Sequence, residues 1–170
     1  PKVHAGTSSG RATDAFQNEI KDLFPQDAWE MGDAKVIRNG NATLLFKDFE
    51  SQEDKTVRVF PCTAVIRPET EDQAPLILQA PEGAIVRLDR QLDLRSGQFG
   101  KPVGGRLLGK IRIYSPGRAD GTGRLLIETS NVQITTRRLW TANEVTVQYD
   151  QSYALGSDLI IQLMSANQSK

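Results

Sequence analysis

The stretch "LLIETSNVQITTRRLWTANEVTVQYDQSYALGSDLIIQL" at residues 125–163 contains three segments in which apolar and polar residues alternate, with polar residues between the segments. In the second segment, Val145, Val147 and Tyr149 stand at every other position and polar residues stand between them. Successive side chains of a β-strand point to opposite faces of the sheet. The stretch therefore predicts strands that each have one dry face.

The alternation changes phase inside the first of these segments. Ile127 is apolar at an odd position, whereas Val132 and Ile134 are apolar at even positions. An uninterrupted strand keeps a single phase, so we expect a β-bulge or a two-residue turn at Ser130–Asn131.

The same period of two recurs over most of the chain. From residue 34 onward it predicts nine strands, at 34–40, 41–49, 56–68, 74–80, 83–90, 105–115, 124–136, 139–150 and 157–164. The glycine-rich segment 96–105 is expected to form a loop or a strongly bent strand. Short strands with turn signals between them are typical of sandwiches and barrels. The predicted fold class is mainly β: an antiparallel twisted β-jelly roll or open sandwich with one short N-terminal helix.

That helix is predicted at about 14–24, where Phe16, Ile20, Leu23 and Phe24 fall on one side of a helix and a proline follows. We expect residues 13–165 to form a single domain, with flexible tails at 1–12 and 166–170. No stretch approaches the roughly 20 apolar residues that span a bilayer. The chain is therefore expected to be a soluble piece of a longer protein, attached to a membrane only through an anchor outside it.

Composition argues against several classes of function. Lys plus Arg and Asp plus Glu both number 21, whereas nucleic-acid-binding proteins normally carry a clustered basic face. Because Cys62 is the single cysteine, the chain cannot form an internal disulfide. His4 is the single histidine and falls in the predicted tail, which leaves no basis for a Ser-His-Asp triad or a histidine metal site. We expect no cofactor and no metal.

The reactive side chains that remain do not form a recognisable catalytic pattern. Cys62 lies among apolar residues in "VFPCTAVI" and is expected to be a core residue rather than a nucleophile. Acidic residues in polar connections, where solvated charge is the default, are Glu53, Asp54, Glu69, Glu71 and Asp72. A hydrolase that uses two such carboxylates is the enzymatic alternative. We expect that the chain is not an enzyme.

A small basic and aromatic group follows the phase change, in "TTRRLWT". Arg137 and Arg138, beside Trp140, are candidates for binding an anionic lipid headgroup through charge-assisted hydrogen bonds. The structural alternative is a strand end with solvated arginines and one tryptophan that covers the end of the barrel.

Five segments of the chain resemble the sequence pattern of a known family, and they occur in the same order along the chain. They are "PEGAIVRLD" (81–89), "GRLLGKIRIY" (105–114), "LLIETSNVQI" (125–134), "WTANEVTVQYD" (140–150) and "ALGSDLIIQL" (154–163). This half of the chain, residues 80–163, resembles the periplasmic lipopolysaccharide-transport proteins of the LptC, LptA and OstA-like family. The helix and the strands before residue 80 lie outside the matching pattern.

The resemblance implies a twisted β-jelly roll in the periplasm or cell envelope. Its apolar interior would take the acyl chains of lipopolysaccharide or another amphipathic lipid, and its edge strands would pair with other β-jelly-roll envelope proteins. Individual lipid-binding residues do not carry over by motif, so the candidates are the inward apolar positions. These are Ile111, Ile113, Leu125, Ile127, Val132, Ile134, Val145, Val147, Leu159 and Ile161.

Two functions follow as expectations. The first is a non-enzymatic cell-envelope domain that binds or passes an amphipathic lipid in lipopolysaccharide-type transport or assembly. The second is a structural or protein-interaction β module that assembles by strand pairing without a ligand, its inward residues serving only as core.

Overall fold

The structure is a computed structural model of the chain. The structure describes residues 10–11, 14–69, 73–93, 95–96 and 98–162. These residues form one short helix, α1 (Asp14–Ile20), one 3-10 helix, η1 (Trp29–Met31), and ten β-strands. The strands are β1 (Gly10–Arg11), β2 (Lys35–Asn39), β3 (Ala42–Ser51), β4 (Thr56–Ile66), β5 (Leu76–Ala80), β6 (Ala84–Leu88), β7 (Pro102–Ser115), β8 (Leu125–Thr135), β9 (Arg138–Tyr149) and β10 (Ser152–Gln162).

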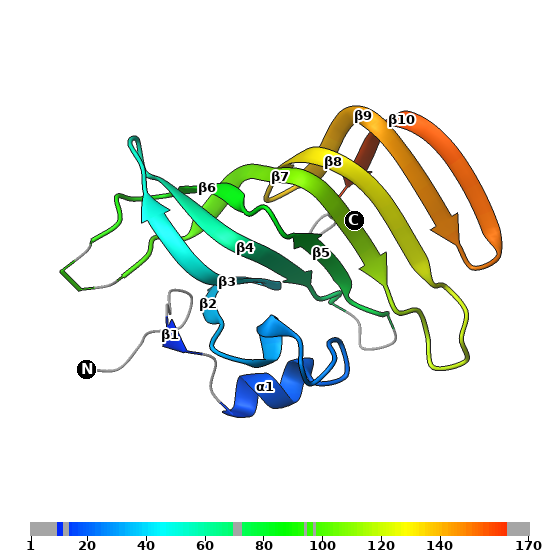
Figure 1. Ribbon diagram of the computed structural model, residues 1–170, viewed down its shortest axis with the longest axis horizontal. Helices are drawn as coiled ribbons and strands as arrows, with labels where there is room; N and C mark the ends of the chain where they lie inside the picture. Colours follow the sequence, from blue (N-terminus) through cyan, green and yellow to red (C-terminus); the bar gives the residue numbers. More distant parts are fainter. Residues whose placement is uncertain (1–9, 12–13, 70–72, 94, 97, 163–170) are drawn as a thin grey trace.

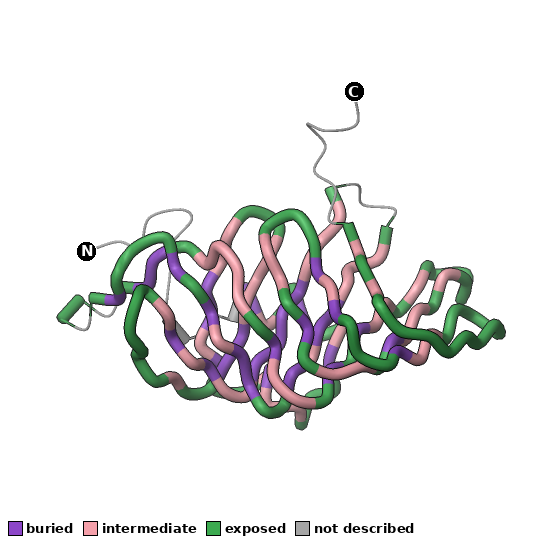
Figure 2. The backbone as a smooth tube through the Cα atoms, turned by 90° about the horizontal axis from the view of Figure 1, so that it is seen from above, coloured by how far each residue is buried: buried purple, intermediate pink, exposed green. Residues whose placement is uncertain are grey.

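All the described strands belong to one antiparallel sheet in the order β1-β2-β3-β4-β5-β7-β8-β9-β10. β6 lies off this path and pairs with both β4 and β7. The long strands β7 to β10 curve strongly, and the β9–β10 hairpin forms one end of the molecule (Figure 1). Seen from above, buried residues concentrate along the middle of the molecule, while the ends of the strands are exposed (Figure 2).

The predicted fold class is confirmed as mainly β and antiparallel with one short helix, and the nine predicted strands correspond to β2 to β10. β7 and β10 begin well before their predicted first residues. β7 begins at Pro102, inside the glycine-rich segment, and β10 begins at Ser152 rather than at residue 157. The first half of β10 is exposed along its length, so it lacks the alternation that marks a half-buried strand.

The phase change in β8 is a bulge and not a turn. β8 runs without a break from Leu125 to Thr135, and its register shifts against both neighbours. Asn131 has a φ of 49°, a left-handed conformation that asparagine adopts more readily than most residues. Its side-chain oxygen accepts a hydrogen bond from the backbone N–H of Gly109 on β7, at 2.9 Å. Between the flanking pairs, β7 has two residues, Leu108 and Gly109, opposite the single Asn131, so the extra residue of the bulge lies on β7 and is bonded to Asn131.

Helix α1 is shorter than the predicted 14–24, because residues 21–24 form a turn before Pro25. Proline lacks the N–H that a continuing helix requires and disfavours the helical region for the residue before it. The two residues of β1 come from the predicted N-terminal tail and pair with Lys35 and Val36. The rest of that tail, with His4, and the whole predicted C-terminal tail lie outside the described residues.

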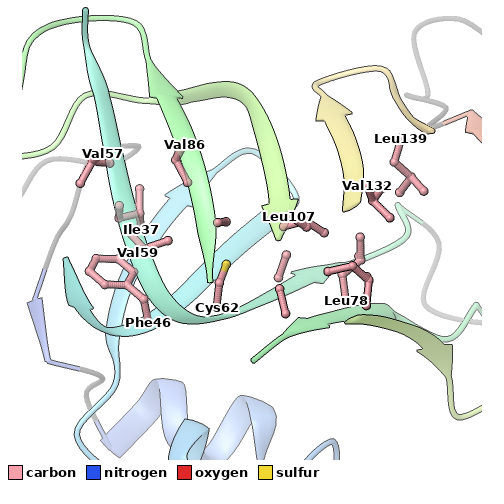
Figure 3. Close-up of a cluster of buried hydrophobic side chains, with 14 of the residues drawn as sticks. Ile37, Phe46, Val57, Val59, Cys62, Leu78, Val86, Leu107, Val132 and Leu139 are labelled. Atoms are coloured by element: carbon pink, nitrogen blue, oxygen red, sulfur yellow. The ribbon is translucent and has the colours of Figure 1, made fainter. Parts of the chain in front are cut away.

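The sheet buries an apolar cluster on each face. The outer cluster lies beneath the helical segments, where Phe16, Ile20 and Phe24 pack on Leu45 and Ile77; α1 lies outside the sheet beside β2 and β3 (Figure 1). The inner cluster is larger and joins the N-terminal strands to the C-terminal ones. Figure 3 shows Ile37, Phe46 and Cys62 on one side of this cluster and Val132 and Leu139 on the other.

Candidate functional site

A cavity of about 580 Å³ lies where the inner faces of the N-terminal and C-terminal strands meet. Its buried walls are apolar and are formed by Ile37, Ala64, Ala84, Val86 and Leu107. The lining also contains exposed residues, so the cavity opens to solvent. A volume of roughly 300–1,000 Å³ with predominantly apolar walls is typical of small-molecule sites.

The alternation of side chains along the strands determines which residues form these walls. Leu44 on β3 pairs with Ala64 on β4, and both point to the inner face, as does Ile37 on β2. On the opposite side, Ala84 of β6 pairs with Leu107 of β7. Because alternate side chains of a strand share one face, these residues lie together on the inner side of the curved sheet.

One hydrogen bond joins the two sides of the cavity at its rim. The side-chain amide of Asn39, at the end of β2, donates to the carbonyl oxygen of Pro102, at the start of β7, at 2.9 Å. These residues are 63 positions apart in the sequence. The contact connects strands that are not neighbours in the sheet and borders the opening.

The rim near the opening is polar. Asn39, Asn41, Thr135, Thr136 and Gln162 belong to the lining, and they supply amide and hydroxyl groups that can both donate and accept hydrogen bonds. The charged residues of the described lining are Arg67, Arg106 and Glu69. An apolar interior with a polar rim suits an amphipathic molecule better than a purely polar or purely apolar one.

Glycines let the start of β7 approach the neighbouring strands. A Cβ on Gly105 would overlap the carbonyl oxygen of Ile85, and a Cβ on Gly104 would lie 3.0 Å from the carbonyl oxygen of Ile134. Both glycines line the cavity. Within the segment 96–105, predicted to be a loop or a strongly bent strand, the residues from Pro102 onward therefore form a closely packed strand.

Aromatic side chains fill the inner cluster directly beyond the cavity. Leu44 and Ala64 line the cavity, and the next inward-facing pair of the same two strands, Phe46 and Cys62, does not. Phe46 is fully buried and packs edge-on against Phe49 and Phe99, with ring centroids 6.2 and 5.7 Å away. Phe46 therefore packs in the core and does not line the cavity.

All ten predicted lipid-binding candidates lie in or against the inner cluster. Buried members are Ile111, Ile113, Ile127, Val132 and Val145, and partly buried members are Leu125, Ile134, Val147, Leu159 and Ile161. Ile134 and Ile161 are the two that line the cavity. The other eight pack against their neighbours in the inner cluster, away from this lining.

The predicted headgroup residues do not line the cavity. The guanidinium of Arg138 lies 4.4 Å from the centre of the Trp140 ring, a cation–π contact on the surface of β9. Arg137 and Arg138 are exposed, and their backbone N–H groups both donate to the hydroxyl oxygen of Thr135. They border the rim residues Thr135 and Thr136 without contributing to the lining.

The residues predicted from the sequence do not include the lining residues of the N-terminal half, such as Ile37, Leu44, Ala64 and Leu76. Their alternation with polar or outward residues is the same signal that marked the C-terminal candidates. The strands were predicted correctly, but the alternation of one strand does not tell which other strand its dry face meets.

The side chains considered for catalysis are placed as follows. Burial raises the pKa of the Cys62 thiol to about 12, so it stays protonated and behaves as a small core residue, as predicted. Glu53 and Asp54 are exposed in the β3–β4 turn. Glu69 is exposed at the cavity rim, while Glu71 and Asp72 lie outside the described residues. Across the described ranges, no three His, Cys, Asp or Glu side chains gather in a metal-binding group.

Within the part of the chain that the structure describes, no helix has both the length and the apolar character to cross a membrane. Comparison of the chain with protein-family models, with curated proteins and with solved structures finds no match in any of the three.

Proposed function

We propose that this chain is a non-enzymatic domain of the cell envelope that binds an amphipathic lipid and passes it on as a link in lipopolysaccharide-type transport or assembly. The observation that carries the proposal is the cavity of about 580 Å³, with apolar walls and a polar rim, between two parts of one curved sheet. Burial of each acyl methylene contributes about 0.8 kcal/mol, so binding in such a cavity requires no reactive group. The resemblance of residues 80–163 to the lipopolysaccharide-transport family supports a periplasmic location.

Photocrosslinking tests the proposal at the cavity itself. A photoreactive amino acid in place of Ile134 or Ile161, two partly buried lining residues, is expected to capture lipid when the folded chain is incubated with lipopolysaccharide or phospholipid vesicles. The control is the same replacement at Glu128, which is exposed on β8 outside the lining. Lipid capture at Ile134 and Ile161 but not at Glu128 supports the proposal. Equal capture at all three sites, or none, contradicts it.

A second function, assembly by strand pairing, is favoured by β10. This strand has 11 residues, ends the strand order of the described sheet, and pairs there with β9 alone. Its outward side carries Tyr153, Leu155 and Ile160, all more than half exposed. Unpaired backbone groups at such an edge are a template for another strand. Slower hydrogen exchange in β10 on self-association or on addition of a partner would support pairing, and association with unchanged β10 exchange would oppose it.

A further inference from the structure

A row of outward-facing side chains crosses the sheet from β6 to β10. In the register of the paired strands, each member of this row lies directly opposite the next. The members are Ile85 on β6, Arg106 on β7, Gln133 on β8, Trp140 on β9 and Ile160 on β10. Directly opposed residues of antiparallel strands project from the same face. The flanking residues Leu107, Val132 and Leu139 are buried in the inner cluster, so this row projects from the outer face.

A second row lies beside the first, because each of its members stands two positions away along the same strand. The members are Arg87, Gly104, Thr135, Arg138 and Gln162. The Arg87 guanidinium extends over β7, where a Cβ built on Gly104 would lie 3.1 Å from one of its nitrogens. Thr135 and Gln162 also line the cavity. We call these two rows the outer rows, and they reach the cavity rim.

The outer rows combine positive charge with accessible apolar surface. Their ionisable side chains are Arg87, Arg106 and Arg138, all three exposed; every member of the rows is a described residue, and none is acidic. Ile160 is 60% exposed, and the Arg138 guanidinium lies 4.4 Å from the centre of the partly buried Trp140 ring. Arg138 and Trp140 are two of the three residues predicted to bind a lipid headgroup, and the structure places them on this surface instead of in the cavity.

This chemistry fits the boundary between the headgroups and the acyl chains of a bilayer. Guanidinium groups bind lipid phosphates, and an anionic leaflet attracts basic residues. Tryptophan is enriched at this boundary, and apolar side chains beside it add buried area. A nucleic acid or an acidic protein would engage the arginines, but it would leave Ile160 without an apolar partner.

We propose that the outer rows dock this domain on an anionic membrane surface, beside the opening of the cavity. The inference rests on the proposed lipid-binding function and names the surface that supplies or receives the lipid. The domain itself makes this contact, in addition to any anchor elsewhere. Because Thr135 and Gln162 belong both to the second row and to the cavity rim, docking brings the rim close to the bilayer. The lipid would then have a short path through water.

Co-sedimentation with vesicles tests the inference. The wild-type chain should bind vesicles of phosphatidylcholine mixed with phosphatidylglycerol more tightly than vesicles of phosphatidylcholine alone. Raising the salt from about 0.1 M to about 1 M should release it, because salt screens the charges. Arg138→Gln should weaken binding to the anionic vesicles about fivefold, as expected for one arginine near a charged leaflet. Ile160→Ser should also weaken it, by removing apolar contact area.

Arg112→Gln and Leu155→Ser are the matched controls, since both residues are exposed on the same outer face but outside the outer rows. The Arg112 guanidinium lies 5.5 Å from the centre of the Tyr114 ring, and Leu155 is 63% exposed on β10. Arg112 lies opposite Glu128, which offsets its charge. Both controls should bind the anionic vesicles as wild type does. Circular dichroism identifies any variant that does not fold, and the arginine and isoleucine variants test the surface independently.

Weaker binding in Arg138→Gln and Ile160→Ser, with no change in the two controls, supports the inference. Equal losses in all four variants, equal binding to neutral and anionic vesicles, or no binding to vesicles overturns it. Binding to double-stranded DNA as tight as to anionic vesicles, and unaffected by Ile160→Ser, would identify a general polyanion site. That result also overturns the assignment to a membrane.

Crosslinking at the cavity separates failure of this inference from failure of the proposed function. Capture of detergent-solubilised lipid by a photoreactive residue at position 134, with no binding to vesicles, overturns the docking surface and leaves lipid binding by the cavity intact. Binding to vesicles through Arg138 and Ile160, with no lipid captured at position 134, supports the docking surface and overturns the proposed function.

Discussion

Asn39 and Pro102 are 63 residues apart, and the hydrogen bond from the Asn39 side-chain amide to the Pro102 carbonyl oxygen joins β2 to β7 at the rim of the cavity. These two strands are not neighbours in the sheet order. The contact therefore connects the two sides of the curved sheet where backbone pairing does not.

Loss of this bond should loosen the opening. Asn39→Ala is expected to lower the free energy of unfolding by about 1 kcal/mol, because it leaves a part-buried carbonyl without its donor. Asn41→Ala is the control, since the Asn41 amide donates to the Arg67 carbonyl oxygen at an exposed site between adjacent strands. Urea denaturation measures both changes. An equal or larger loss in Asn41→Ala would show that the link to Pro102 has no special role.

Glu30 is expected to attach the helical segment to the outer face of the sheet. This carboxylate is 2% exposed, and the same oxygen accepts hydrogen bonds from the Thr63 hydroxyl (2.8 Å) and the Gln79 amide (3.2 Å). Glu30→Leu should cost about 1–3 kcal/mol, because it leaves the buried Thr63 hydroxyl and the part-buried Gln79 amide without an acceptor. Glu30→Gln retains an oxygen acceptor and should recover most of that loss.

The control for Glu30 is Glu19, whose carboxylate lies 3.4 Å from the Arg38 guanidinium with both side chains more than 40% exposed. Glu19→Ala should change stability by less than about 1 kcal/mol, since exposed ion pairs contribute little. Chemical denaturation compares the three variants. A Glu30→Leu variant as stable as wild type would contradict the assigned role.

Stability should fall in alkaline solution because of Cys62. Its pKa rises from 9.0 to about 12 on burial in the folded state. Above pH 9 the unfolded chain releases the thiol proton while the folded chain keeps it, so raising the pH favours unfolding. The contribution of the protonated Cys62 thiol to the free energy of unfolding is fully present below pH 9. It should be lost between pH 9 and about 12, at about 1.4 kcal/mol per pH unit.

Other groups titrate in the same range, so the effect is measured as a difference. The free energy of unfolding of wild type minus that of Cys62→Ala should decline as the pH rises above 9. A difference that does not change with pH would mean that the folded chain does not suppress thiol ionisation. The same burial predicts that alkylation of Cys62 is slow in the folded chain and follows unfolding.

Gly83 and Gly40 lie in two turns of the sheet, so the same substitution at each can be compared. Both have positive φ, 99° and 60° respectively. A Cβ at Gly83 would overlap the carbonyl oxygen of Val59, whereas a Cβ at Gly40 would meet nothing within 4 Å. Gly40→Ala should therefore cost about 1–2 kcal/mol from backbone conformation alone.

Gly83→Ala should cost clearly more, because the backbone around the β5–β6 turn must also move. That turn places the Gly83 carbonyl oxygen where it accepts a hydrogen bond from Leu108 N–H, at 2.9 Å. Thermal denaturation of the two variants tests this order. If Gly40→Ala is the more damaging change, close packing at Gly83 is not the deciding factor.

The nine strands β2 to β10, their dry faces and the irregularity at Asn131 of β8 could be predicted from the sequence. Each of these features is local, because the alternation along a strand reports which side chains share a face. The phase change between Ile127 and Val132 marked a bulge at Asn131 for the same reason. The first half of β10 could not be found in this way, since a strand exposed on both faces has no alternation to read.

Which residues line the cavity was determined by the tertiary structure. Ile134 and Ile161 line it while Ile113 and Val145, with the same alternation, pack in the core. That difference depends on how the sheet curves and on which distant strand faces each residue. It depends also on the contact between Asn39 and Pro102 at the rim. The sequence by itself determined which faces are dry, because that is a property of neighbouring residues. Contacts between strands far apart in the chain decided which dry positions pack in the core and which line the cavity.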